Sequence, residues 1–327
     1  MKTLFKFTKI SWATLGLTLV FLTSCGSKDA RESEIDQVTV DFSVERFDQL
    51  FYDTPVAELG NLKRTYPYLF PKQFDDAFWA EKKRDTLFEE LHSEVEKKFA
   101  DLGGLTEELT GFFKHIKYYF PEQDPKRVVT LISEVDVTSK AIYADSLVLI
   151  SLDTYLGEDH RFYKGFPEYM RPTFESSQVL PDLAESFAIS RISVPSDRSL
   201  LAQMIYQGKI LYTKELLLPK MPKENLITYT KAQFDWCREN EAEMWRYFIE
   251  NKLLFDTDTK LHARFVQASP FSKFYLDIDA ESPGRVGAWL GWQIVGSYMK
   301  NNNVTLQELF AKDAKVLFEE SRYKPKK

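Results

Sequence analysis

The chain has 327 residues, 44% of them apolar and 15% aromatic, which is enough to bury a sizeable core. Its 43 basic and 49 acidic residues give a net charge of −6. Because no basic patch stands out, nucleic acid and anionic lipid surfaces are excluded as main partners.

The N-terminus has the pattern of a bacterial export signal. A lysine-rich start precedes an apolar run over 10–22 that is too short for a typical membrane span. The run ends in "LTSC", where small residues precede Cys25 as in a lipobox. We therefore predict a lipoprotein signal peptide over 1–24 and a membrane anchor through a diacylglyceryl group on Cys25. The alternative is an ordinary signal peptide with a cysteine there by chance.

The rest of the chain predicts a short tether and one domain. Residues 25–34 are polar and are expected to form a lipidated tether, and residues 35–327 a single globular domain. Cys237 is the only other cysteine, so no disulfide framework is expected. In its sequence context Cys237 is most simply a small buried hydrophobe.

The first half of the domain mixes short strands with helices. Alternating apolar residues over 35–42 predict an N-terminal strand, and a helical turn follows from 44–52. Apolar residues at helical spacing predict one helix over 74–104, ending at a glycine pair, and a second over 105–118.

Two runs of β-branched residues, 127–137 and 141–153, predict neighbouring strands, and the remainder reads as helices. These predicted helices are 196–219, 228–254 and 282–302, followed by terminal helices. The expected fold class is α+β, mostly helical with a small sheet near the front.

Capping residues predict where three of these helices begin. Thr230 with Gln233, and Thr305 with Glu308, have the spacing of capping boxes. Ser282 followed by Pro283 predicts an N-cap and a first helical residue.

The residue patterns do not favour a metal-binding or cofactor-binding site. A catalytic zinc normally needs three protein ligands, and the histidines are scattered without i, i+4 spacing. Acids over 153–160 could bind a hard cation, but the loop lacks the alternate acids and central glycine of a calcium site. We predict no metal and no cofactor. The four histidines are His92, His115, His160 and His262.

The segment "SPGRVG" offers a different possibility. Its glycines and Arg285 stand at a predicted helix start, where exposed N–H groups can hold an anion. Glycines at helical spacing equally predict a tight packing face, flanked by Trp289 and Trp292. Exposed tryptophans stack on ligands, whereas buried ones belong to a core.

Six ordered blocks resemble one known family. They are "RFDQLFYDT", "LKRTYPYLFP", "FKHIKYYFP", "LISLDTYLGEDHRFY", "LLAQMIYQGKILY" and "ESPGRVGAWLGWQIVGSYM". Over about 35–325 the chain is similar to the gliding-motility lipoprotein GldB family of Bacteroidetes. The resemblance implies an envelope role in gliding and in the associated type IX protein-secretion machinery. It further implies a periplasm-facing lipoprotein, in either the inner or the outer membrane, whose partners are other gliding and secretion proteins.

The chain is also distantly similar to predicted zinc peptidases that carry HExxH on a helix. The corresponding residues would be Ala202-Gln203-Met204-Ile205-Tyr206. Ala202 has no donor atom, and the Gln203 amide cannot act as a carboxylate base. The resemblance therefore implies a degenerate zincin-like scaffold that is not an enzyme. A residual cleft would involve Gln203, Tyr206, Tyr212, Arg285, Trp289 and Trp292.

Two further hypotheses stay open. The first is a module that binds peptide or peptidoglycan fragments through the aromatic helix face around Trp289 and Trp292. The second is a hydrolase with an atypical site that uses one or more of Asp153, Asp159, His160 and Glu241.

Overall fold

The computed structural model describes residues 26–326, so the predicted signal peptide and the lipidation site Cys25 lie outside the described residues. The chain divides into two units, Met1–Val38 and Thr39–Lys327. In the described part of the first unit, Gly26–Asp36 forms helix α1 where we expected a polar tether. Between 26 and 326, no helix is both long and apolar enough to span a membrane.

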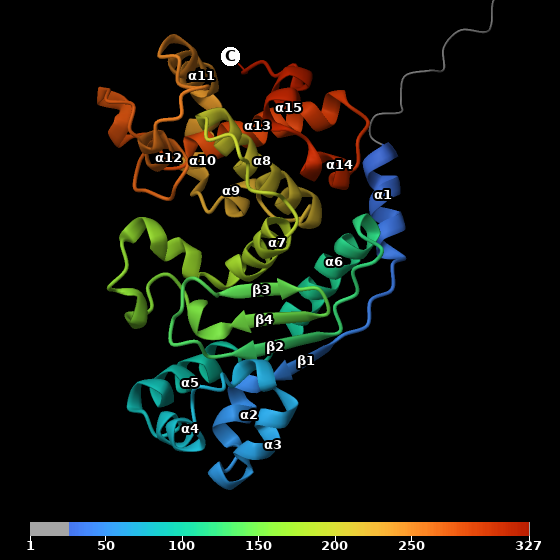
Figure 1. Cartoon of the computed structure of the whole chain (residues 1–327), viewed down its shortest axis with the longest axis vertical. Coiled ribbons are helices and arrows are strands. Elements are labelled where there is room, and N and C mark those ends of the chain that lie inside the picture. Colours follow the sequence, from blue (N-terminus) through green and yellow to red (C-terminus); the bar gives the residue numbers. More distant parts are fainter. Residues whose placement is uncertain (1–25, 327) are drawn as a thin grey trace, which may run out of the picture. The chain divides into compact units, whose positions relative to one another are not determined.

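The second unit contains a four-stranded sheet with the order β1-β2-β4-β3 (Figure 1). β1 (Ser43–Arg46) pairs in parallel with β2 (Arg127–Leu131), which pairs in parallel with β4 (Leu147–Ser151). β3 (Ala141–Ala144) runs antiparallel to β4. The two predicted strand segments are confirmed, and the second folds into a hairpin. The predicted strand over 35–42 is wrong, because pairing with β2 begins only in β1.

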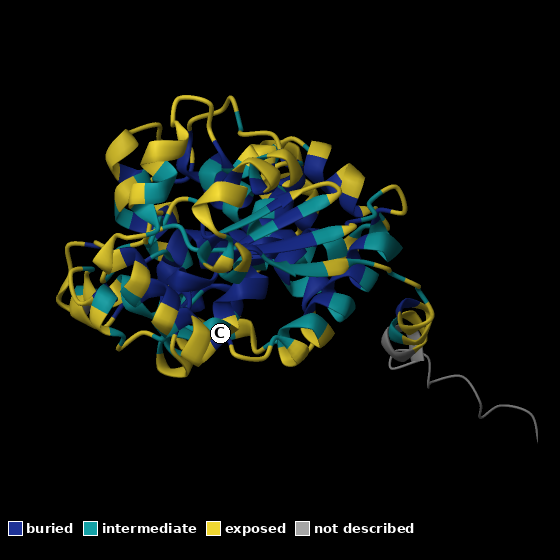
Figure 2. Cartoon of the chain, turned by 90° about the horizontal axis from the view of Figure 1, so that it is seen from below, coloured by how far each residue is buried: buried dark blue, intermediate teal, exposed yellow. Residues whose placement is uncertain are grey.

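Side chains alternate between the two faces of the sheet, so each face packs on its own apolar cluster. Val128, Val148 and Ile150 enter the main core, whereas Val129 and Leu149 belong to a smaller aromatic cluster. Figure 2 shows the buried residues concentrated along the strands and the inner faces of the helices. The helices of the smaller cluster are α2 (Phe47–Asp53), α3 (Leu59–Thr65) and α5 (Thr86–Lys98), with α4 (Asp76–Lys82) beside them.

The main core is helical, which confirms the predicted α+β class with a small sheet. The central helices are α6 (Gly103–Tyr119), α7 (Val179–Ile189), α8 (Leu200–Leu217) and α13 (Val286–Asn301). The shorter helices around them are α9 (Lys223–Leu226), α10 (Lys231–Glu239), α11 (Glu241–Glu250), α12 (Thr259–Phe265), α14 (Leu306–Ala311) and α15 (Ala314–Ser321).

Two predicted helices are interrupted. The helix expected over 74–104 breaks before Asp85, whose carboxylate accepts a hydrogen bond from the Phe88 amide and starts α5. The helix expected over 228–254 breaks at Asn240, between α10 and α11. In both cases the apolar helical spacing continues past the break, but a polar residue that can cap a helix lies at the start of the second helix.

The capping boxes at Thr230 and Thr305 are confirmed, because each threonine side chain and its acidic or amide partner are both bonded. The predicted start of the helix at Ser282 and Pro283 is wrong. α13 begins three residues after the proline, and its N-cap Arg285 has a φ of 64°. A non-glycine residue in this left-handed region costs free energy, so the surrounding structure has to hold it there.

α8 and α13 make the closest helix contact of the core. A Cβ atom on Gly291 would overlap the carbonyl oxygen of Met204, and one on Gly208 would overlap the carbonyl oxygen of Gly291. Backbone therefore meets backbone where the two helices cross. The glycines of α13 are not equivalent, since a Cβ atom on Gly296 would meet no atom within 4 Å.

We expect Gly291→Ala to lower the free energy of unfolding by about 3 kcal/mol or more, because the overlap is with backbone and neither helix can move alone. Gly296→Ala is the matched control on the same helix and should stabilise by up to about 1 kcal/mol through helix propensity. Urea denaturation of both variants measures the difference. Equal effects of the two substitutions would contradict the close crossing.

Candidate functional site

The first half of α8 separates two hollows. Gln203 lines one of them and Tyr206 lines the other, so the structure does not place these two predicted residues in a common cleft. Tyr212 lies further along α8, half-buried against the main core, and lines neither hollow.

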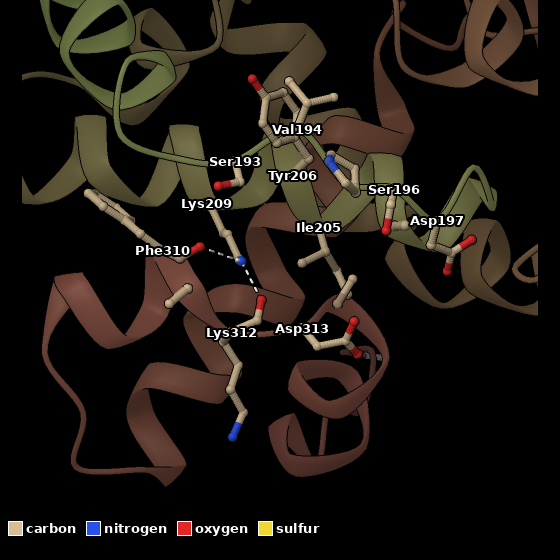
Figure 3. Close-up of a pocket in the computed structure, with 14 residues that line it drawn as sticks. Ser193, Val194, Ser196, Asp197, Ile205, Tyr206, Lys209, Phe310, Lys312 and Asp313 are labelled. Atoms are coloured by element: carbon tan, nitrogen blue, oxygen red, sulfur yellow. Dashed lines mark hydrogen bonds between the residues drawn. The ribbon is translucent and has the colours of Figure 1, made fainter.

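The hollow at Tyr206, called here the Lys209 cavity, has a volume of about 270 Å³ (Figure 3). Three segments form its walls: the 193–197 loop that leads into α8, one face of α8, and the 310–314 turn between α14 and α15. The face of α8 contributes Ala202, Ile205, Tyr206 and Lys209.

Lys209 is the most deeply placed charge in this cavity, with only 6% of its surface exposed. Its Nζ donates hydrogen bonds to the carbonyl oxygens of Phe310, at 3.2 Å, and Lys312, at 2.6 Å (Figure 3). Burial lowers the pKa of Lys209 to about 8, against the opposing effect of Asp313. The lysine therefore ties the end of α14 to the middle of α8 at a cost in desolvation.

The second hollow has a volume of about 330 Å³ and lies between the start of α8 and α12. Half-buried Gln203 and His262 face it, together with exposed Arg198 and Gln267. Its apolar floor consists of Leu200 and Leu261, and burial lowers the pKa of His262.

The remaining predicted site residues lie on α13 or at its start. Trp289 and Trp292 are only 1% and 2% exposed, so neither ring offers a face to a ligand, contrary to the hypothesis of a stacking surface. The Trp292 indole donates a hydrogen bond to Glu215 at 2.8 Å. Arg285 is half-buried and donates to the carbonyl oxygen of Ile227 at 3.3 Å.

Sequence reasoning missed a group of charges that joins α7 to α8 and to the residue before β3. Glu185 and Asp182 lie one turn apart on α7. The Glu185 carboxylate is 3.0 Å from Nζ of Lys214, and the Asp182 carboxylate is 2.7 Å from Nζ of Lys140. Lys214 is buried, with 2% of its side chain exposed, whereas 35% of the Glu185 side chain is exposed. Although part of the Glu185 side chain is exposed, the protein packed around its carboxylate opposes ionisation. The nearby cations, Lys214 and then Arg285, outweigh this effect and lower the pKa of Glu185.

One signal in the sequence could have revealed these lysines. A helix with apolar residues around most of its circumference is expected to be largely buried, and α8 has this character, with no exposed residue along its length. Lys209 and Lys214 interrupt its apolar pattern, and both are in fact buried and hydrogen-bonded.

The other titratable candidates are spread through the fold. Asp153 is buried and accepts hydrogen bonds from the amides of Ser133 and Val135, while Asp159 on the same loop is exposed. Burial raises the pKa of the Cys237 thiol. Glu241 accepts a hydrogen bond from the Tyr323 hydroxyl at 2.7 Å. Among residues 26–326, no three histidine, cysteine or acidic side chains are grouped so that they could hold a metal ion.

The four histidines do not converge. The His92 ring stacks on Tyr52 with ring centroids 4.0 Å apart, and the Nδ1 of His115 lies 2.8 Å from the carbonyl oxygen of Gly111. His160 lies 3.5 Å from Glu94, and His262 lines the hollow beside Gln203.

The fold and these sites define an α+β protein with an ion-paired interior and two small hollows beside one central helix. The chain belongs to the family described as gliding motility protein GldB, which it matches over residues 28–325. The family resemblance drawn from the sequence is thereby confirmed. No curated protein and no solved structure matches the chain. The likeness to zinc peptidases stays a prediction.

The Glu185–Lys214 pair should respond unequally to the loss of either partner. Glu185→Gln leaves a buried ammonium without its counter-charge and should lower the free energy of unfolding by about 3 kcal/mol. Lys214→Met leaves a partly exposed carboxylate that keeps Arg285 nearby, so we expect roughly half that loss or less. Urea denaturation at neutral pH measures both. A larger loss for Lys214→Met would contradict the assigned burial.

Lys209 should make stability depend on pH. Its folded pKa of about 8 lies below the ordinary 10.5, so the unfolded chain binds more protons between these values. Stability conferred by Lys209 therefore rises with pH across this window, by about 1.4 kcal/mol per unit. The free-energy difference between the wild type and Lys209→Met should shift in favour of the wild type from pH 7 to pH 10. A difference that is flat with pH would refute the lowered pKa.

Proposed function

We propose that this gliding motility protein is a lipid-anchored, periplasm-facing envelope component that supports the gliding and type IX secretion machinery without catalysis. The observation that carries the proposal is the family match over nearly the whole described chain. The lipobox pattern at Cys25 supports the anchor. Two or more acyl chains each bury many methylene groups at about 0.8 kcal/mol apiece, so release from a membrane would be negligible.

The ionisation of the candidate groups supports a non-catalytic role. A general base works best when its pKa lies near the operating pH, but the pKa of Glu185 is lowered and its carboxylate is bonded to Lys214. A nucleophilic cysteine needs a thiolate, but burial raises the pKa of Cys237. The pKa of Tyr206 is raised as well, by burial and then by Glu185.

A glutamate at the second position of the HExxH pattern favours α7 over α8 as the remnant of a zinc motif. On α7 the sequence Ala184-Glu185-Ser186-Phe187-Ala188 keeps the glutamate and has alanine at both histidine positions. Ala184 and Ala188 are buried, and the ammonium of Lys214 lies 3.0 Å from the glutamate. In this proposal a lysine provides the positive charge beside Glu185, and the pair serves to hold α7 against α8.

Complementation of a strain that lacks the gene tests the whole proposal. Wild-type chain should restore gliding and type IX secretion. The double variant Glu185→Gln with Lys214→Met should restore both as well, because it removes the pair together and leaves no unpaired charge. Intact gliding and secretion in the deletion strain would sink the proposed role. A stable double variant that reaches the envelope but fails to restore gliding would instead point to chemistry at Glu185.

Cys25→Ala should release the protein from the membrane fraction and abolish gliding while the domain stays folded, since the anchor adds nothing to the core. Cell fractionation and thermal unfolding measure the two effects. Cys237→Ala, the change of the other cysteine, is the control and should stay with the membrane. If Cys25→Ala still fractionated with membranes, the lipid anchor at this residue would be wrong.

A further inference from the structure

The Lys209 cavity combines an apolar wall with polar groups that have unused hydrogen-bonding capacity. Its apolar wall comes from all three segments and includes Val194, Ile205 and Phe310. The hydroxyl groups of Ser193, Ser196 and Tyr206 also line the cavity (Figure 3). None of the three hydroxyls forms a hydrogen bond with another described residue. Small-molecule sites commonly combine apolar surface with placed polar groups, and in this cavity polar side chains make up as much of the lining as apolar ones.

Lys209 provides a positive charge at this wall. A lysine ammonium has three protons, and two of those of Lys209 are donated to the carbonyl oxygens of Phe310 and Lys312. One donor is left for a ligand. A carboxylate is the natural acceptor, because a hydrogen bond between two charged groups is about twice as strong as one between neutral groups.

The cavity also carries negative charge. Asp197 and Asp313 line it and act as local caps: Asp197 accepts from the amide and hydroxyl of Ser199, and Asp313 accepts from the amides of Lys315 and Val316. Each carboxylate keeps further lone pairs. The cationic Lys312 on the same wall is already paired with Glu320 at 2.7 Å. A ligand that satisfies the cavity therefore needs both a carboxylate and a positive group.

We propose that the Lys209 cavity binds a small peptide with free amino and carboxyl ends. Lys209 receives the carboxylate, Asp197 or Asp313 receives the ammonium, and the free hydroxyls bond to the peptide group between them. The volume of about 270 Å³ equals roughly nine water molecules at about 30 Å³ each, which suits a dipeptide of small residues. Such a ligand can come from protein breakdown, with L-residues, or from cell-wall peptide, with D-residues.

This binding should depend on pH in a defined direction. The charged and titratable groups that face Lys209 across the cavity are Asp313, Asp197, Lys312 and Tyr206. A bound carboxylate stabilises the protonated lysine, and the aspartate that receives the ligand stabilises its protonated amino end, whose ordinary pKa is about 8. Binding near pH 8.5 should therefore take up protons, and affinity should fall as the pH rises above about 8.

Isothermal titration calorimetry on the full chain in detergent tests the proposal, with L-Ala-L-Ala and D-Ala-D-Ala as probes. We expect one of the two to bind, and its handedness identifies the source. Acetylation of its amino end or amidation of its carboxyl end should each weaken binding by about tenfold, roughly 1.4 kcal/mol. Titrations in buffers of different ionisation enthalpy measure the proton uptake.

Two variants separate binding from folding. Lys209→Met should abolish binding, and Tyr206→Phe should weaken it several-fold while leaving the unfolding curve unchanged, since this hydroxyl has no hydrogen-bond partner among the described residues. Gln203→Met, which alters the other hollow, is the control and should bind as the wild type does. If neither dipeptide binds, or if the wild type and Lys209→Met bind equally well, the proposal is overturned. The experiment is independent of gliding, so its failure would leave the proposed function untouched.

Discussion

The contact that the rest of the structure depends on is the crossing of α8 and α13 at Gly208 and Gly291. With no side chain on either glycine, the two backbones touch, and further helices contact the pair they form: α6, α7, α9, α12, α14 and α15. The crossing fixes what each face of α8 meets. One face lies against α13, another faces α7 and carries Lys214, and the half-buried side chains of Gln203 and Tyr206 border the two hollows. A small displacement of α13 would therefore alter the charge cluster and both hollows together.

Features that depend on a few neighbouring residues could be predicted from the sequence. The capping boxes at Thr230 and Thr305 use partners three residues away, and the β-branched runs of β2 and β4 form a sheet as expected. Features decided by distant contacts could not. α13 starts late because Arg285 is held at a positive φ by its tertiary surroundings, and β1 starts where β2 offers a partner, not where the alternating pattern begins.

The predicted cleft also depends on contacts between residues that are distant in sequence. Gln203 and Tyr206 stand three residues apart on one helix, and that spacing cannot reveal that separate loops meet them on either side. The burial of Trp289 and Trp292 follows from the close approach of two glycines distant in sequence. The charged interior was missed because Lys214 and Glu185 form an ion pair only when α7 and α8 pack side by side. Sequence patterns could therefore predict individual residues that line the hollows, but not which of them lie together.

The parallel pairing of β1 with β2 has a consequence for the order of events in the cell. Ser43 pairs with Arg127, and Gly208 contacts Gly291, so each contact needs a partner more than 80 residues later in the chain. A chain that crosses a membrane N-terminus first therefore cannot complete these contacts one after another as it emerges. If Cys25 carries the proposed anchor, the anchored end of the chain also lies far in sequence from α13, the helix that completes the core. The domain would then fold as a chain already fixed to the membrane at one end, with its aromatic segments exposed beside the lipid until α13 closes on α8.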